Sequence, residues 1–461
     1  MEAAASQSRL SGELGAHTAR AYGELLLRSL GRRAWRPLDL DDEHPALGWA
    51  RSGLMALTGE REGAPQMCPA PLAACADGAL AALASLAPEG AFANLRGSQF
   101  LAERAAVTGY TRGGPVSPGG SCRLLEAADG GIALNLAREA DWALLPAWLE
   151  REDITDWPQI AAAVRSRSAR ELVERGREIG LAMALDPEMG DRPPFFSRNG
   201  GLSPISNGNG GLSPISRPRV IDLSSLWAGP LCGHLLQRAG AEVIKVESLQ
   251  RPDGARQGPQ AFFDLLNAGK ASVALDFTTA EGRAQLRALL LSADIVIEGS
   301  RPRALRQLGI DAAEVLRTNS GLTWVSITGH GREPGRENWI AYGDDAGVAA
   351  GLSALMREAT GQKLIAGDAI ADPLTGLHAA LAAWAGFQSG EGSLISLALS
   401  GVVSHCIGFD PPERGWVARH ADWTAVLAGS GREVAHPRLR RPHGLARPLG
   451  ADTGILGKIC R

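Results

Sequence analysis

The sequence predicts an α/β fold, in which a Rossmann-like, doubly wound parallel sheet is joined to a smaller α+β domain. From residue 219 onward, short apolar runs alternate with segments of helical apolar spacing. The first two of these runs enclose a turn and a helix, which makes a βαβ unit with parallel strands. Earlier, residues 122–150 are typical of a hairpin followed by a helix.

The βαβ unit is RVIDLSSLWAGPLCGHLLQRAGAEVIKVES, residues 219–248. Its turn contains Ala228-Gly229-Pro230, and such turns at the carboxyl edge of a parallel sheet favour anionic ligands. The same sequence is also compatible with a simple strand-to-helix turn. The predicted strands cover 219–223, 241–247, 271–277, 293–299 and 322–329, with helices at 279–291 and 311–317.

A linker separates two halves of the chain. The octapeptide NGGLSPIS occurs at 199–206 and again at 209–216, in a stretch rich in Gly, Ser, Asn and Pro. We expect an N-terminal lobe over 1–192, a linker over 193–216, an α/β domain over 217–410 and a C-terminal tail over 411–461. An ordered loop packed across a surface is the alternative for the linker.

The two halves also share a weaker repeat. GLMALTG at residue 53 resembles GLSALMR at residue 351, and ADGALAALASL resembles LTGLHAALAAW, both at an offset of 298. This ungapped match favours a duplication. Asp372 of the second copy then corresponds to Ala74 of the first (372 − 298 = 74).

Composition excludes several classes of protein. Of 461 residues, 45% are hydrophobic and 21% charged, which predicts a folded globular chain; Gly, at 57 residues, is frequent. The net charge of −3 and 5% aromatics argue against a nucleic-acid partner. The first 33 residues suit an amphipathic helix better than a signal peptide, and no apolar run spans a membrane, so we expect a cytoplasmic protein without a membrane partner. Six scattered cysteines predict neither a disulfide framework nor a metal site.

The segments RVIDLSSLWAGPLCGHLLQRAG, NAGKASVALDF, ADIVIEGSRPRALRQLGI, VSITGHG and ADPLTGLHAALAAW occur in this order. Together they resemble the family III CoA-transferases, the CaiB/BaiF group, from residue 217 to about 406. The N-terminal lobe resembles the later part of the same family, including its small domain (SCRLLEAADGGIALNLAREADWALL).

The resemblance implies a fold of the family III type and a transfer of CoA between an acyl-CoA and a small carboxylic acid. CoA is then a substrate, no cofactor is permanently bound, and the subunits form an interlinked homodimer. The family's nucleophilic Asp, followed by three residues and Gly, matches Asp372 and Gly376. A carboxylate can attack a thioester because thiolate is a good leaving group. Taken alone, Asp372 before Pro373 is equally suited to be a helix N-cap.

The resemblance also implies a CoA site and further groups beside the nucleophile. Each CoA-site residue alone is more often a surface or structural group, and the carry-over to Arg256 is uncertain because its motif is altered. The implied CoA-binding residues are Ala228, Gly229, Pro230, Lys245, Glu247, Arg256, Asn267, Lys270, Arg301 and Arg303. The implied neighbours of the nucleophile, besides Gly376, are Tyr342, Asp344 and Asp345.

Two other functions stay open. A 2-methylacyl-CoA racemase on the same scaffold needs a second acid/base group, and Tyr342 stands where racemase-like members carry a histidine. A non-catalytic, acyl-CoA-binding relative is the other alternative, since the first copy of the repeat has no carboxylate at Ala74.

Overall fold

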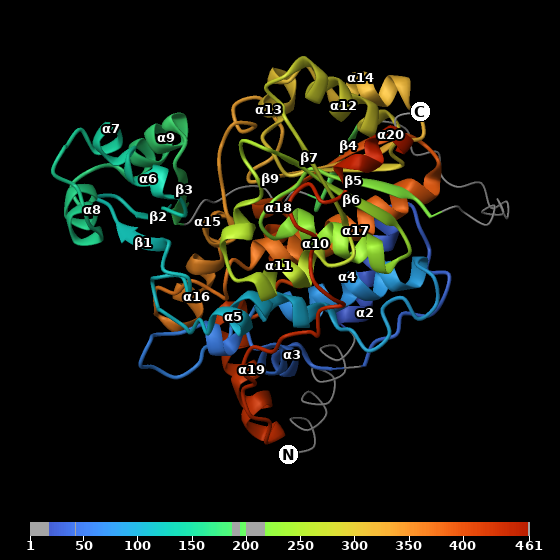
Figure 1. The fold of residues 1–461 in the computed structure, drawn as a ribbon. Coiled ribbons are helices and arrows are strands. Elements are labelled where there is room, and N and C mark those ends of the chain that lie inside the picture. The colour runs from blue at the N-terminus through green and yellow to red at the C-terminus, as the bar shows by residue number, and fades with distance from the viewer. Residues whose placement is uncertain (1–17, 42, 187–193, 200–216, 460–461) are drawn as a thin grey trace.

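The computed structural model describes residues 18–41, 43–186, 194–199 and 217–459. Its centre is a seven-stranded sheet with the order β4-β10-β9-β8-β5-β6-β7 (Figure 1). All neighbouring strands are parallel except β4, which is antiparallel to β10. The strands are β4 (Ser197–Asn199), β5 (Arg219–Asp222), β6 (Glu242–Ser248), β7 (Ala271–Leu275), β8 (Ile295–Glu298), β9 (Thr323–Thr328) and β10 (Ser393–Ala398).

The strand order confirms the predicted doubly wound fold. From β5 the chain builds outward through β6 to β7, then crosses back to β8 and continues through β9 to β10. The direction therefore changes between β5 and β8, and ligands of such sheets bind beyond the carboxyl ends of the strands at this switch point. The helices of this part are α10 (Ala228–Arg238), α11 (Gln260–Asn267), α12 (Ala280–Leu291), α13 (Pro302–Gln307), α14 (Ala312–Thr318), α15 (Gly343–Ala349), α16 (Leu352–Thr360), α17 (Ala371–Ser389) and α18 (Leu399–Phe409), with a 3₁₀ turn η3 (Gly254–Gln257).

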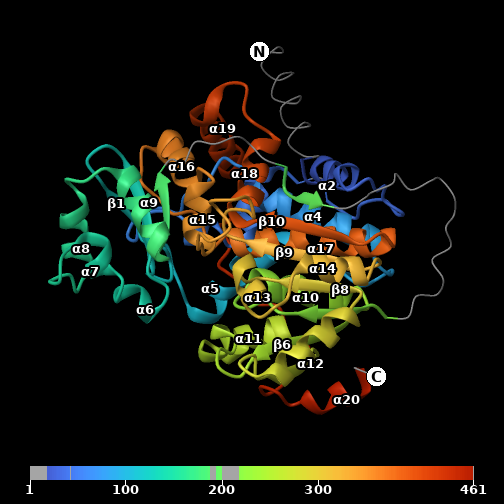
Figure 2. The ribbon, with the colours of Figure 1, turned by 90° about the horizontal axis from the view of Figure 1, so that it is seen from above.

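The smaller α+β domain is also confirmed. Strands β1 (Cys122–Glu126), β2 (Gly131–Asn135) and β3 (Ala182–Asp186) form an antiparallel sheet, in which β1 and β2 make the predicted hairpin. This domain lies to one side of the large sheet, and its strands β2 and β3 contact α15 (Figure 2). Its helices are α6 (Glu139–Trp142), α7 (Leu145–Leu149), α8 (Trp157–Val164) and α9 (Ala169–Ile179).

One hydrophobic core joins the two halves of the chain. It contains buried residues of the first half, such as Tyr22 and Trp49, together with residues of α10, α17 and α18. The repeat-related helices α4 and α17 pack on each other, and α4 also packs on α2. The N-terminal helices are α2 (Thr18–Ser29), α3 (Pro45–Ser52), α4 (Leu72–Leu86) and α5 (Glu103–Thr108), with 3₁₀ turns η1 (Met55–Leu57) and η2 (Gly97–Ala102).

Two glycines set the close approach of α2 and α4. A Cβ atom at Gly23 would lie 2.8 Å from the carbonyl oxygen of Gly78, and one at Gly78 would overlap the carbonyl oxygen of Ala19. Both contacts are with backbone, which cannot move aside without separating the helices.

The tail crosses from one half of the molecule to the other. Helix α19 (Gly415–Ser430) contacts α3 and α16. The extended segment that follows starts beside α3, where the Ala435 N–H donates to the carbonyl of Ala50 at 2.8 Å. It ends along the open edge of β7, where Asp452 bonds both backbone groups of Ser272. The last elements are η4 (Thr453–Ile455) and α20 (Leu456–Ile459).

The expected linker falls largely outside the described residues, namely 193 and 200–216. Within it, Phe195 is buried in the common core and Ser197–Asn199 forms the edge strand β4. The first 17 residues of the expected amphipathic helix are also outside the described part, and α2 begins at Thr18. None of the described helices is long and apolar enough to cross a membrane.

We predict that Gly78→Ala lowers the free energy of unfolding by about 1–3 kcal/mol, because the added methyl group overpacks the contact between α2 and α4. Gly429→Ala is the control, since a Cβ atom there meets nothing within 4 Å in helix α19. That change should be neutral or slightly stabilising. Urea denaturation of both variants measures the difference, and equal stabilities would contradict the proposed close packing.

Candidate active site

Asp372 lies in the first turn of α17, where the N-termini of α10 and α15 also meet. The helix begins at Ala371, so Asp372 is inside the helix and Ile370 is the N-cap residue. The carboxylate accepts hydrogen bonds from the backbone N–H groups of Ala228 and Gly343, the first residues of α10 and α15. Burial raises the pKa of Asp372 to about 6, although Arg104 and these two N–H groups lower it.

Glycine is required at two positions around this carboxylate. A Cβ atom at Gly343 would overlap both the Asp372 carboxylate and the carbonyl oxygen of Ala369. A Cβ atom at Gly376 would lie 2.7 Å from the carbonyl oxygen of Ala228. Gly376, expected beside the nucleophile, is thus placed at the contact between α17 and α10.

Two more carboxylates lie close to Asp372. Asp344, in the first turn of α15, has its pKa raised to about 7 by burial and by Asp368. Its Oδ1 accepts the backbone N–H of Ala369 at 2.7 Å. Ala369 has φ of +45°, a left-handed conformation that is unfavourable for a residue with a side chain. Asp344 therefore holds the turn before Asp372 from the side of α15.

The cation of this cluster comes from the first half of the chain. Arg104 of α5 donates from Nε to Asp368 Oδ2 at 2.9 Å and from Nη2 to Asp368 Oδ1 at 2.6 Å. Burial lowers the pKa of Arg104, but Asp368, Asp344 and Asp372 outweigh it and the pKa is raised.

The small domain contributes a further contact. Asn135 at the end of β2 donates from Nδ2 to Asp345 Oδ1 at 2.8 Å, and the same oxygen accepts the Tyr342 N–H at 3.0 Å. Burial raises the pKa of Asp345 to about 7 and that of Tyr342 to about 12. Arg138 of the small domain lies close enough to Tyr342 to lower its pKa. The site is thus built from both halves.

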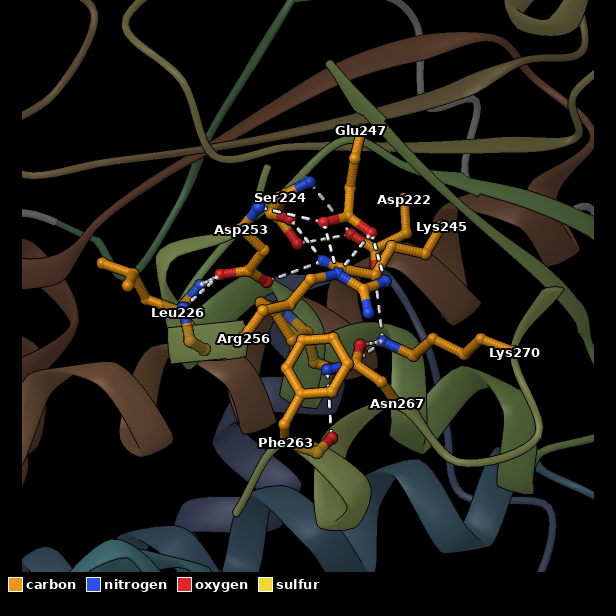
Figure 3. Close-up of polar contacts among 12 residues, drawn as sticks. Asp222, Ser224, Leu226, Lys245, Glu247, Asp253, Arg256, Phe263, Asn267 and Lys270 are labelled. Atoms are coloured by element: carbon orange, nitrogen blue, oxygen red, sulfur yellow. Dashed lines mark hydrogen bonds and ion pairs between the residues drawn. The ribbon is translucent and has the colours of Figure 1, made fainter. Parts of the chain in front are cut away.

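Most of the implied CoA-binding residues form an internal polar network below the turn between β5 and α10 (Figure 3). The Lys270 ammonium group bonds Asp222 Oδ2 at 2.9 Å, the Pro230 carbonyl at 2.8 Å and Asn267 Oδ1 at 3.1 Å. These three acceptors use all its protons.

Lys245 and Arg256 have internal partners as well. Lys245 Nζ pairs with Asp253 Oδ2 at 2.8 Å and donates to the Ser224 carbonyl at 2.8 Å. Arg256 forms a two-pronged pair with Glu247, with distances of 2.9 and 2.6 Å, and its guanidinium carbon lies 4.5 Å from the centre of the Phe263 ring. The network ties the turn, β6 and α11 together, and its charges are balanced within the protein.

Arg301 and Arg303 are placed differently, beyond the carboxyl end of β8. Burial lowers the pKa of Arg301, and so do the nearby charges of Arg303, Arg138 and Arg251. In the described part of the chain, none of Arg251, Arg301 and Arg303 forms an ion pair with a carboxylate. These three and Arg138 make an arginine cluster at the switch point of the sheet, close to Tyr342.

Arg104, Asp368 and Asn135 of this site are not predicted from the sequence. Asp368 precedes Asp372 by four residues, which offered a weak signal. Arg104 and Asn135 lie far from Asp372 in the sequence, so no local pattern connects them to it. No group of three His, Cys, Asp or Glu side chains is arranged to hold a metal ion within the ranges that the structure describes.

Residues 216–422 match the sequence profile of CoA-transferase family III. The succinate–glutarate CoA-transferase of Agrobacterium fabrum is 35% identical over 203 residues, which are 40% of this chain and 51% of the relative. The succinyl-CoA–D-citramalate CoA-transferase of Chloroflexus aurantiacus is 30% identical over 192 residues, 39% of this chain and 48% of the relative. The chain thus spans about half the length of these relatives.

Among solved structures, a CaiB/BaiF family protein from Brucella suis is 29% identical, with a TM-score of 0.37 over 49% of this chain and 60% of that one. A hypothetical protein from Mycobacterium tuberculosis is also 29% identical, with a TM-score of 0.38 over 41% of this chain and 56% of the other. Residues 216–422, a little under half of the chain, are thus similar to CoA-transferase family III.

Proposed function

We propose that this protein is a CoA-transferase that moves CoA from an acyl-CoA to a carboxylic acid, with Asp372 as the nucleophile. The observation that carries the proposal is the Asp372 carboxylate, half-buried at the switch point among three helix N-termini and bonded by the N–H groups of Ala228 and Gly343. The relatives' printed activities, transfer of CoA between carboxylic acids, support it.

The reaction begins when an Asp372 oxygen attacks the thioester carbonyl carbon. The C–S bond breaks, CoA leaves as thiolate and an aspartyl–acyl anhydride remains. The thiolate then attacks the Asp372 carbonyl carbon, which releases the donor acid and leaves an aspartyl-CoA thioester. The acceptor carboxylate attacks this thioester, forming a second anhydride and freeing thiolate again. Attack of the thiolate on the acceptor's carbonyl carbon yields the new acyl-CoA and regenerates Asp372.

The arginine cluster suits the phosphate groups of CoA. Guanidinium groups bind phosphate through paired hydrogen bonds, and Arg301 and Arg303 lack a carboxylate partner among the described residues. We therefore propose that Arg301 and Arg303 bind CoA, whereas Lys245, Glu247, Arg256, Asn267 and Lys270 support the turn that carries Ala228.

One observation favours the racemase alternative. Asp344 lies beside Asp372 with a pKa of about 7, so two acid/base groups are available for moving an α-proton. The histidines do not fill this role: His378 is engaged with Tyr22 Oη at 2.8 Å and the Leu374 carbonyl at 2.7 Å. Exchange of the α-proton of a 2-methylacyl-CoA in deuterium oxide, with no acceptor acid present, would identify a racemase. CoA binding without either reaction would identify a non-catalytic relative.

Asp372→Asn should reduce CoA transfer at least 10³-fold, because the amide cannot act as the nucleophile. Exposed Glu62→Gln serves as the control and should keep full activity. In the native protein, an acyl-CoA followed by hydroxylamine should leave a hydroxamate on the peptide containing Asp372, located by mass spectrometry. Full activity of Asp372→Asn, or a label found only on a cysteine, would refute the mechanism.

We expect kcat/KM to fall tenfold per pH unit on the acid side of about pH 6. The pKa of Asp372 is raised to about 6, and only its ionised form attacks the thioester, so activity is lost as the pH falls through that value. A pH–rate profile between pH 4.5 and 8 measures the acid limb. A limb near pH 4, the ordinary range of an aspartate, would contradict the effect of burial.

Lys270→Met and Arg301→Ala should distinguish a residue that stabilises the turn carrying Ala228 from a residue that binds CoA. Lys270→Met leaves the buried Asp222 without its partner, so it should lower the free energy of unfolding by about 3–5 kcal/mol. Arg301→Ala should leave stability nearly unchanged and raise the KM for acyl-CoA about tenfold, while the KM for an acyl-pantetheine, which lacks the phosphates near the nucleotide, stays the same. The assignment fails if Arg301→Ala raises both KM values equally.

A further inference from the structure

Arg104 reaches the nucleophile's turn from another part of the chain. It belongs to α5, and its two hydrogen bonds to Asp368, at 2.9 and 2.6 Å, come from the Nε and Nη2 donors on one edge of the guanidinium group. Asp368 is fully buried, while the Arg104 side chain is 30% exposed. A two-pronged pair of this kind fixes the orientation of both groups, because the planar guanidinium matches the carboxylate.

The turn that Arg104 holds is strained. Gly367 and Ala369, which flank Asp368, both have positive φ, +73° and +45°. Such a conformation at Ala369 persists only when its surroundings enforce it. The enforcing contacts are the Arg104 pair at Asp368 and the bond from the Ala369 N–H to Asp344 Oδ1 at 2.7 Å. The turn leads directly into Asp372, whose N–H bonds the Ala369 carbonyl at 2.9 Å.

Arg104 also contacts the second element that surrounds Asp372. Its guanidinium carbon lies 5.4 Å from the centre of the Trp227 ring, a cation–π distance. Trp227 immediately precedes Ala228, the residue whose N–H bonds the Asp372 carboxylate. Arg104 thus contacts both the turn before Asp372 and the turn before α10.

Arg104 partly compensates for the negative charges around Asp372. Facing Asp372 are Asp368 from the strained turn, Asp344 and Tyr342 at the start of α15, and Arg104 from α5. Arg104 is the cation among them, and it opposes the effects of burial and of Asp368 on the pKa of Asp372.

We propose that Arg104 is a positioning residue for the nucleophile: its pair with Asp368 sets the turn that presents Asp372, and its charge keeps Asp372 ionised at neutral pH. This inference rests on the proposed function for its kinetic consequence only. The first half of the chain then takes part in the reaction through Arg104, and its role goes beyond packing.

The test compares Arg104→Gln with Arg104→Lys and a matched control. Loss of the charge should move the acid limb of the pH profile upward by about one unit or more, since an opposite charge within 4–6 Å shifts a carboxyl pKa by about 1–3 units. Activity at pH 6 then falls at least about fivefold, because the ionised fraction of Asp372 falls from about one half to about one tenth. Arg104→Lys keeps the charge without the fork, so the limb should return toward its original position while kcat stays reduced.

Arg440→Gln is the control. Arg440 pairs with Glu103, the neighbouring residue of α5, with one contact at 3.0 Å, and its guanidinium lies over Phe100, away from the carboxylate cluster. If the Arg104–Asp368 pair is only structural, Arg104→Gln and Arg440→Gln should have the same effect. Both should lower the stability and leave the acid limb of the pH profile unmoved. That result would overturn the proposal.

A second measurement does not depend on turnover. Asp372 can be titrated directly by NMR in protein labelled with ¹³C at the aspartate side chains, with the resonance assigned by its absence in Asp372→Asn. Its midpoint should rise in Arg104→Gln and fall in Asp368→Asn, which removes a negative charge. If Arg104→Gln does not fold, the downward shift in Asp368→Asn still decides, and an unmoved midpoint there overturns the proposal. Activity retained by Asp372→Asn would refute the proposed function, yet the titration would still test Arg104.

Discussion

The partial burial of the Asp372 carboxylate is the constraint on which the rest of the site depends. A carboxylate removed from water is costly unless hydrogen bonds and an opposite charge compensate for it. Here the compensation comes from two helix-terminal N–H groups, Ala228 and Gly343, and from Arg104. The N-termini of helices favour negative charge, and Gly343 is the residue that lets α15 approach α17 so closely. A fully solvated carboxylate would not need the two N–H groups or the Arg104 cation, because water would stabilise its charge.

The same constraint explains why the two halves share one core. The turn from β5 to α10 belongs to the second half, but Arg104 and Asn135 belong to the first. Their positions depend on the packing of α4 against α17 and of the small domain against α15. At Ala74, the repeat-related position on α4, there is no carboxylate. The nearby Asp77 is tied to Arg51 at 3.0 Å and to the Ser98 N–H at 2.7 Å, as a structural group.

Local sequence patterns were sufficient for the βαβ elements and the hairpin, because each is determined by alternation of apolar residues and by turns within about 30 residues. Asp372 was indicated only by the resemblance, through the short motif that ends at Gly376. Local patterns could not reveal Arg104, since a lone arginine on a six-residue helix has no signature, and its partner Asp368 is 264 positions away. Lys270 shows that a sequence motif does not reveal the internal partners of a side chain. The resemblance implies that Lys270 binds CoA, but in the structure its three protons are donated to Asp222, Pro230 and Asn267.

Burial at this site makes the protonation state that favours folding differ from the one that favours reaction. The pKa values of Asp344, Asp345 and Asp372 lie at about 7, 7 and 6 in the folded protein, above the ordinary value of an aspartate in an unfolded chain. Between about pH 4 and 7 the folded state therefore binds more protons than the unfolded state, so these groups favour folding less as the pH rises. The proposed role of Asp372 as nucleophile requires the opposite, since a carboxylate attacks in its ionised form. Arg104 is placed where it reduces this conflict, because a cation beside the cluster lowers the free energy of the ionised carboxylates.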